Sequence, residues 1–212
     1  MYLHPAFKIS ADEALPILQE RAFGLFVVPT SKAPFGVHVP FLVSETEAGT
    51  LRVELHVARA NPIHEEIGDE CQALLACQGP DAYISPDWYG IDDQVPTWTY
   101  VSVHLKGIAR VRPMENNLDH VDRLVDIFEE RLTPKTPWTS AKMDARKRDM
   151  MMRAIVSIDL EVETIEAQKK LIQHKGKTEH DGAIAGLRAR PDQGSQQIAD
   201  LMQQTTNEKF QE

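Results

Sequence analysis

The chain has few cysteines for its length. Only Cys71 and Cys77 occur among 212 residues, and Cys77 lies in the apolar run LLACQG. Two cysteines do not build a disulfide framework, so we expect both thiols to be reduced. They also lack the CxxC spacing that a zinc site uses. Disulfide-stapled domains and cysteine-ligated zinc modules are therefore not expected.

Long apolar runs are absent as well. No segment approaches the roughly 20 apolar residues that are needed to span a bilayer. The first residues, MYLHPAFKISADE, lack the basic start and the apolar stretch of a signal peptide. We therefore expect a cytoplasmic protein without a membrane-spanning segment.

Positive charge is scarce. The sequence has 23 Lys and Arg against 32 Asp and Glu, and its formal net charge is −9. Because non-specific affinity for nucleic acid comes from Lys and Arg, this composition does not support DNA binding. One local exception is ARKRDMMMR at 145–153, where a polyanion site is first to be sought. A solvated basic helix face is the alternative interpretation of that segment.

Common catalytic motifs are also missing. The sequence contains no GxGxxG, no Walker loop and no HExxH. His38 and His56 lie on expected strands, but no third partner completes a metal set or a catalytic triad. A lone histidine on a strand is more often a hydrogen-bonded structural residue than a ligand or a base. Hydrolysis and zinc chemistry are therefore not indicated, and no catalytic residue is predicted.

The sequence does contain a series of short strand patterns. Apolar and polar residues alternate along LRVELHVARA at 51–60, as they do in a half-buried strand. Composition and turn signals predict the other strands at 23–30, 36–45, 71–79, 81–85, 95–111 and 155–167, with Gly79-Pro80 as a break. Helical spacing predicts helices at 11–22, 63–70, 116–132, 139–153, 180–190 and 195–206.

Few helices separate most of these strands, so we expect an antiparallel barrel rather than a parallel sheet. The fold class is mainly β with α (α+β), with peripheral helices and a helical C-terminal tail. We expect a barrel domain at 1–167 and a helical segment at 168–212. The last helix has only Ile198, Leu201 and Met202 as its apolar stripe. Because this stripe is narrow, the segment should pack on the barrel or on a partner chain.

Two stretches suggest binding. Arg59 lies at the end of the strand at 51–60, two residues before Asn61. A guanidinium and an amide at a strand end can hold a phosphate, although a surface Arg beside a turn-forming Asn is the alternative. A second stretch is rich in aromatic rings, whose large apolar area suits a core, a subunit interface or a flat ligand. Its rings are Tyr83, Trp88, Tyr89, Trp98 and Tyr100.

A family resemblance rests on several motifs that occur in order. They are MYLHPAF, VHVPFL, HVARANP, GPDAYISPDWY, VPTWTYVSVHLKG and DGAIAGL, and they cover about residues 1–190. In these motifs the chain resembles the PaiB-type family of FMN-binding negative transcriptional regulators. The resemblance implies an FMN-binding split barrel, in which two chains pair and FMN lies in grooves at their interface. This agrees with the barrel expected from the strands.

The resemblance also implies a set of cofactor-binding residues by matching position. Backbone groups of the VHVP strand would pair with the polar edge of the isoalloxazine ring. Other residues surround the ribityl phosphate or lie on the adjoining strand and in a late motif. The set comprises His38, Val39 and Pro40 along one wall, His56, Arg59 and Asn61 near the phosphate, Thr97 and Trp98 on the adjoining strand, and Lys170 and Gln173 in the late motif.

Some positions depart from the family pattern. Thr99 replaces the Asn that usually follows the Trp, and the late Lys-Trp-Lys-Leu-Ser-Gln-Asn motif is QKKLIQHK here. If this segment closes over the flavin, the changes would weaken FMN binding or alter the ligand. The differing residues of the late motif are Gln168, Lys169, Ile172 and His174.

Three functions are compatible with this fold. The first, which the resemblance favours, is a homodimeric FMN-binding regulator of transcription that acts on DNA or through a partner. The second is a flavin-dependent oxidoreductase or flavin reductase acting on a small molecule, in which the cofactor carries the redox chemistry. The third is a haem-binding or cofactor-free barrel, with His38, His56 or His104 as axial ligands. Whether the protein is an enzyme stays open at this point.

Overall fold

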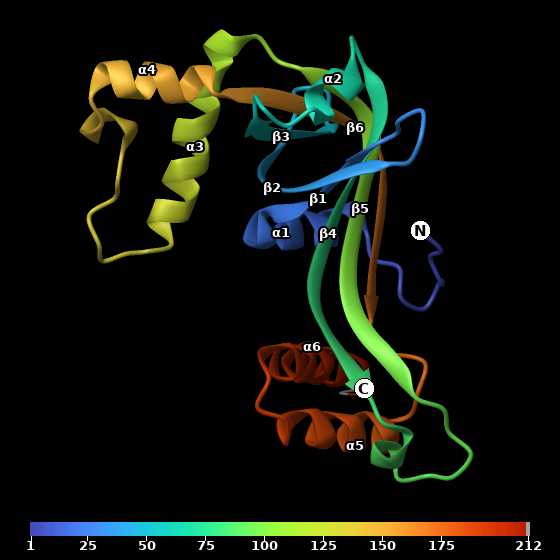
Figure 1. Ribbon diagram of the computed structural model, residues 1–212. Coiled ribbons are helices and arrows are strands. Elements are labelled where there is room, and N and C mark those ends of the chain that lie inside the picture. Colours follow the sequence, from blue (N-terminus) through green and yellow to red (C-terminus); the bar gives the residue numbers. More distant parts are fainter. Residues whose placement is uncertain (211–212) are drawn as a thin grey trace. The chain divides into compact units, whose positions relative to one another are not determined.

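The computed structural model of the protein describes residues 1–210 (Figure 1). Its strands are β1 (Phe23–Val28), β2 (Phe35–Glu45), β3 (Leu51–Ala58), β4 (Cys71–Ile84), β5 (Thr97–Val111) and β6 (Ile155–Lys170). Its helices are α1 (Ala11–Arg21), α2 (Ile63–Ile67), α3 (Asn117–Glu130), α4 (Ala145–Arg153), α5 (Lys177–Arg188) and α6 (Gln193–Phe210). Short 3₁₀ turns are η1 (Pro86–Tyr89), η2 (Met114–Asn116) and η3 (Ser140–Lys142). Most predicted elements are present within a few residues of their expected ends; the exceptions are the strands predicted at 71–79 and 81–85 and the helix predicted at 139–153.

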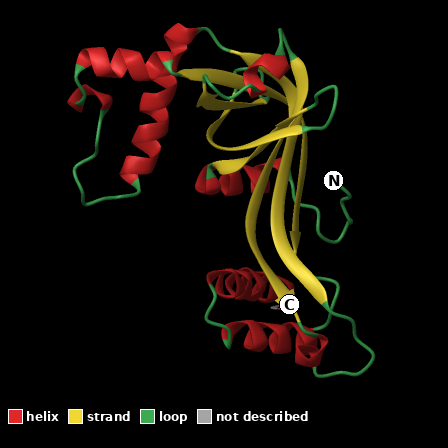
Figure 2. Ribbon diagram, in the orientation of Figure 1, coloured by secondary structure: helices red, strands yellow, loops and turns green. Residues whose placement is uncertain are grey.

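The strands close into a barrel in the order β1-β2-β3-β6-β5-β4. Antiparallel ladders join β1 to β2, β2 to β3 and β3 to β6. Figure 2 shows the strands in yellow and the helices in red. The predicted antiparallel barrel with peripheral helices is therefore confirmed.

Contacts divide the chain into two compact units. The first unit comprises 1–17, 78–103 and the chain from Glu166 onward, and the second comprises 18–77 and 104–165. Strands β4, β5 and β6 each contribute residues to both units. The C-terminal helices α5 and α6 thus belong to the same unit as the aromatic stretch that follows β4.

The core of the second unit follows the predicted alternation. Val53 and Leu55 of β3 are fully buried, and Ile158 of the neighbouring β6 is buried with them. Gly107 brings β5 close to β6, because a Cβ at this position would lie 1.8 Å from the carbonyl oxygen of Glu161. Only a residue without a side chain permits that approach. Gly107 is therefore needed where β5 passes close to β6.

The first unit has a separate apolar core. Helices α5 and α6 pack on each other, and the apolar stripe of α6 is buried as predicted for Ile198 and Met202. Residues from the end of β4, from η1 and from the end of β6 complete this core. Its buried members are Ala82, Ile84, Tyr89, Leu171, Ile172, Ala183, Ile184, Leu187, Ile198, Ala199 and Met202.

Two local predictions were wrong. The Gly79-Pro80 pair does not break the strand, since β4 continues from Cys71 to Ile84. The ladder between β4 and β1 covers Leu74–Ala76, so Pro80 lies outside it and removes no donor from it. Residues 139–153 do not form one helix either. A 3₁₀ turn precedes α4, whose first turn is capped when the Asp144 carboxylate accepts from the backbone N–H of Lys147 at 3.1 Å.

No helix among the described residues has both the length and the apolar character needed to cross a bilayer.

Candidate functional site

The predicted wall of the flavin site lies on β2. Val39 is buried, whereas the imidazole of His38 is exposed and stacks on Phe23 of β1, with ring centroids 6.1 Å apart and planes inclined by 18°. The ladder between β2 and β3 ends where Phe41 pairs with Leu55. Pro40 is adjacent to Phe41 on β2, and His56 is adjacent to Leu55 on β3. These two predicted residues therefore lie on neighbouring strands.

His56 points toward α3 and meets a second histidine there. Its Nδ1 atom lies 3.0 Å from Nε2 of His120, which is fully buried. Burial lowers the pKa of His56, and burial together with the His56 charge lowers the pKa of His120 to about 4. The two rings are therefore neutral near pH 7 and share one hydrogen bond.

Arg59 and Asn61 have partners within their own unit. The Arg59 side chain donates from Nε to the carbonyl oxygen of Arg153 at 2.7 Å and from Nη2 to that of Ile155 at 3.0 Å. Asn61 Oδ1 accepts from the backbone N–H of Ile63 at the start of α2. These bonds agree with the alternative interpretation of Arg59 and Asn61, in which both residues have a local structural role. They occupy two of the three guanidinium nitrogens of Arg59.

A buried ionic cluster lies between β3, β6 and α3, and the sequence did not predict it. The Glu54 carboxylate, 5% exposed, accepts from Arg112 and, at 2.5 Å, from Nη2 of Arg123. Burial alone would raise the pKa of Glu54, but the two guanidinium groups outweigh it and leave that pKa lowered. Asp159 Oδ1 lies 3.4 Å from Arg112 Nε, and burial raises the pKa of this carboxyl.

One sequence signal could have indicated this cluster. Glu54 and His56 occupy the polar side of an alternating strand, which is normally solvated. Helix α3 presents His120 and Arg123 three residues apart, on one face. The carboxylate of Glu54 can pair with Arg123, and His56 can hydrogen-bond to His120. This match indicates that the helix covers the polar side of the strand.

Four predicted site residues lie in the first unit, and the structure joins two of them. Lys170 Nζ donates to Thr97 Oγ1 at 2.9 Å and lies 5.8 Å from the centre of the Tyr100 ring. Trp98, the next residue after Thr97, is 56% exposed and contacts the ring of Tyr83 edge-on at 6.1 Å. The start of β5 and the end of β6 thus present an ammonium group, a hydroxyl group and exposed aromatic rings together.

Gln173 lies at the end of the late motif and stabilises the turn after β6. Its Oε1 accepts from the backbone N–H of Leu171 at 2.8 Å, and its Nε2 donates to the carbonyl oxygen of Lys169. Ile172, within this turn, has a positive φ of 54° and is fully buried. Gln173 therefore fixes the backbone that follows Lys170.

The residues that depart from the family pattern have structural partners. Thr99 is buried, and its hydroxyl donates to the carbonyl oxygen of Ala82 at 2.9 Å. Gln168 is also buried, and its Nε2 donates to the hydroxyl of Tyr100 at 2.8 Å. His174 lies edge-on against Phe7. These substitutions are thus accommodated in the first unit without leaving the two buried polar side chains unpaired.

The aromatic stretch divides between two roles. Tyr89 is buried and Trp88 packs against α5, where the glycines at 182 and 186 make room for it. Tyr83 and Trp98 remain exposed at 42% and 56%. The first pair therefore belongs to the core of its unit, the second pair is available to a ligand or another chain, and Tyr100 is half-buried.

No group of three or more metal-ligating side chains occurs among the described residues.

The profile of a protein family described as "Putative FMN-binding domain" matches residues 1–164. The chain belongs to this FMN-binding domain family. The predicted resemblance is therefore confirmed, and FMN is the cofactor that the family description names.

One similar protein aligns with nearly the full length of this chain. "Protease synthase and sporulation protein PAI 2" of Bacillus subtilis is 28% identical over 205 residues, which are 96% of this chain and 97% of that protein.

Solved structures also share the barrel fold. The FAD and haem binding protein from Mycobacterium smegmatis has a TM-score of 0.52 at 14% identity, over 76% of this chain and 71% of that one. The flavocytochrome Anf3 from Azotobacter vinelandii has a TM-score of 0.53 at 15% identity, over 79% and 72% of the two chains. At these identities the likeness concerns the fold alone.

The residues of the first unit fit the chemistry of FMN. A flavin needs a flat apolar surface for its ring, hydrogen-bonding groups for its polar edge and a cation for its phosphate. Trp98 with Tyr83 offers exposed ring surface, Thr97 a hydroxyl, and Lys170 an ammonium group held beside that hydroxyl. This donor set would hold FMN without any metal ion.

Proposed function

We propose that this protein is a homodimeric FMN-binding regulator of the PaiB type, which acts on transcription directly or through a partner. Support comes from the FMN-binding domain family and from PAI 2, whose whole length aligns with this chain. The name of PAI 2 associates that relative with protease synthesis and sporulation. A regulator of gene expression is consistent with such a name.

The observation that carries the flavin part is the hydrogen bond of 2.9 Å between Lys170 and Thr97 beside exposed Trp98. These residues lie 73 positions apart in the sequence, on different strands. Lys170 would neutralise the ribityl phosphate, and Thr97 would orient the ammonium group toward it. Trp98 and Tyr83 would cover the flat ring of FMN. The bound flavin would supply the redox chemistry.

In the second unit, the predicted β2 residues offer their own groups to a flavin. The exposed face of His38 and Phe23 offers a second flat surface. Backbone groups around Val39 would meet the polar edge of the flavin. Arg59 keeps Nη1 for a phosphate, because its Nε and Nη2 donate to backbone carbonyls. We assign no acid or base to the site, in keeping with a non-catalytic role.

The first test is the visible absorption spectrum of freshly purified protein, followed by FMN titration if the protein is colourless. A flavin spectrum or saturable FMN binding supports the proposal. No chromophore and no FMN binding would overturn the flavin part, and a haem Soret band would replace it with a haem protein.

The regulatory part needs a separate test. In one assay, the FMN-loaded protein is mixed with NADH or NADPH in air, and oxidation of the nicotinamide is measured. In a second assay, a gel shift measures whether the protein binds the DNA upstream of its own gene. Multiple turnover of a reduced nicotinamide without any DNA or transcriptional effect would replace the regulator with an oxidoreductase. A change in transcription on deletion of the gene, without turnover, supports the regulator.

A further inference from the structure

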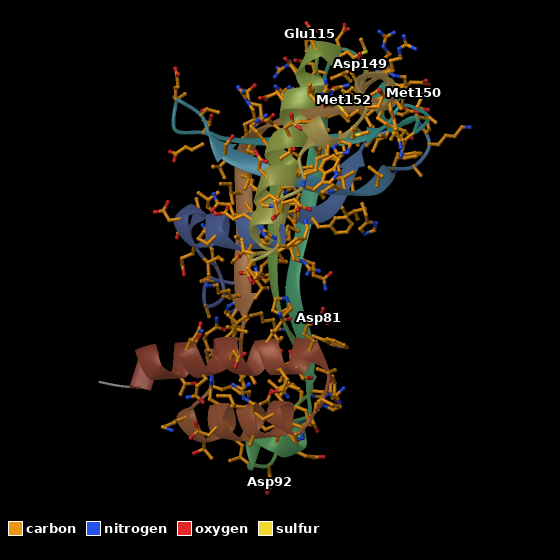
Figure 3. All side chains as sticks on the ribbon, turned by 90° about the vertical axis from the view of Figure 1, so that its left-hand side faces the viewer. Asp81, Asp92, Glu115, Asp149, Met150 and Met152 are labelled. Atoms are coloured by element: carbon orange, nitrogen blue, oxygen red, sulfur yellow. The ribbon has the colours of Figure 1, made fainter. Side chains whose placement is uncertain are left out.

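Helix α4 has an exposed surface that combines positive charge with methionine. Arg146, Lys147 and Arg153 are exposed, and none of them forms an ion pair with a described residue. Met150 and Met151 of the same helix are 61% and 44% exposed (Met150 is labelled in Figure 3). In a protein of net charge −9, this basic surface, in which Asp149 is the one acidic side chain of the helix, would attract an acidic partner.

The loop that follows η1 has the opposite character. Asp87 and Asp92 are exposed, and within the described chain neither carboxylate has an ion-pair partner. Ile91 and Val95 of the same loop are 45% and 75% exposed. A shallow cavity of about 340 Å³ lies in this loop, lined by Pro86, Asp87, Gly90, Ile91, Asp92, Asp93 and Gln94. The cavity is large enough to receive a methionine or a lysine side chain.

The loop is held in place by its own unit. Lys175 bonds to the side chain of Gln94, and its ammonium group lies 4.5 Å from the centre of the Tyr89 ring. Gly90 has a left-handed backbone with φ of 68°, and it reverses the chain after η1. A loop that is ordered before binding loses little conformational entropy when a partner docks.

We infer that the α4 surface of one copy docks on the 86–95 loop of a second copy of this chain. Each surface carries unpaired charge of one sign next to exposed apolar side chains, and the two signs are opposite. Docking would pair Arg146 and Lys147 with Asp87 and Asp92, and would bury the methionines against Ile91 and Val95. Each copy carries both surfaces, so the same contact can join one copy to another.

A second copy fits this surface better than nucleic acid does. Phosphate groups would neutralise the basic residues of α4 but would leave Met150 and Met151 exposed. A protein loop with apolar residues covers both kinds of side chain at once. The inference depends on the proposed homodimer, but it does not depend on FMN.

The test uses two charge-reversal variants, R146E/K147E and D87K/D92K. Both α4 positions lie in the first helical turn, where glutamate is favourable to the helix dipole, so the first variant should fold. Asp93 is left unchanged because its φ of 58° disfavours lysine. Sedimentation velocity at low ionic strength should show that each variant alone dimerises about tenfold or more weakly than the wild type.

Mixing the two variants gives the decisive result. Between the two variants, the reversed helix meets the reversed loop and the native helix meets the native loop, so every such contact is attractive. The mixture should therefore form dimers with nearly wild-type affinity, while each variant alone does not. If the two surfaces met within one chain, mixing would restore nothing, and the inference would be wrong.

One control variant and three further outcomes complete the experiment. A K8E/K32E variant makes an equal charge change at exposed lysines elsewhere and should dimerise as the wild type does. A wild type that is monomeric at all concentrations overturns the inference, and so does a dimer that neither reversal weakens. Loss of DNA retention by R146E/K147E with unchanged dimerisation would assign α4 to nucleic acid instead. FMN titration of the same variants tests the flavin proposal separately.

Discussion

His56 on β3 and His120 on α3 are joined by one hydrogen bond of 3.0 Å between Nδ1 and Nε2, across 64 positions of sequence. One ring must donate and the other must accept, so a single proton lies between them. The second ring nitrogen of His120, Nδ1, is buried and has no hydrogen-bond partner. This pair therefore links the helix to the barrel only while the rings are not both protonated.

The histidine pair should make the protein sensitive to acid. Burial lowers the pKa of His120 from 6.5 to about 4, so the unfolded chain binds more protons between these pH values. The free energy of unfolding should then fall as the pH falls through this window, by about 2 kcal/mol at pH ~5. Urea unfolding of the wild type and of His120→Gln, at pH ~5 and ~7.5, measures this difference. Equal pH dependence in the two proteins would contradict it.

Glu54 should be important for stability. Its carboxylate is buried between Arg112 and Arg123, and Glu54→Gln would remove the anion that these two guanidinium groups share, leaving Asp159 for Arg112 and Asp119 for Arg123. We expect the free energy of unfolding to fall by about 3 kcal/mol, as measured in urea. The control is Arg110→Gln, whose exposed ion pairs with Glu70 and Glu161 should contribute little. Similar effects of the two substitutions would show that the cluster is not buried as described.

Gly186 should not tolerate alanine, although alanine usually stabilises a helix interior. A Cβ at this position would lie 2.2 Å from Cδ2 of Trp88. We expect Gly186→Ala to lower the free energy of unfolding by about 1–3 kcal/mol, and W88L/G186A to recover part of the loss. Gly182→Ala is the control, because its Cβ would meet the backbone oxygen of Trp88 at 1.9 Å. Leucine at 88 should not rescue that variant.

Lys170→Met tests the phosphate site that we propose. Removing the ammonium group beside Thr97 should weaken FMN binding by about tenfold or more, and riboflavin binding much less, because only FMN carries a phosphate. Fluorescence titration with both flavins measures the two affinities. Lys169→Met makes the same chemical change next to it and should alter neither affinity strongly. Equal losses for FMN and riboflavin would remove Lys170 from the phosphate site.

Arg59→Ala separates a structural role from a binding role. The substitution removes the two hydrogen bonds to Arg153 and Ile155, so we expect about 1 kcal/mol of lost stability. If Arg59 also meets the phosphate, FMN affinity should fall more than riboflavin affinity at a temperature where the variant is folded. A change in stability without a difference between the flavins would leave Arg59 with its structural role alone.

The secondary structure was largely predictable because its signals are local. Alternation in LRVELHVARA predicted β3, and the Ile198 and Met202 stripe predicted the buried face of α6. Local rules failed where a distant segment decides the outcome. The Gly79-Pro80 pair resembles a break, but Gly79 lies close to Val101 of β5 and the strand continues. A neighbouring strand can override a turn signal because it supplies the hydrogen bonds.

The sequence by itself determined the strands, the antiparallel barrel, the family and the identity of the candidate flavin residues. Only the tertiary structure decided which of those residues meet. It joined Thr97 to Lys170 and turned His56 toward His120, and it directed Arg59 to backbone carbonyls. The physical reason is that periodicity records which face of one element is apolar. It carries no information on which polar group of a distant element will come within hydrogen-bonding distance.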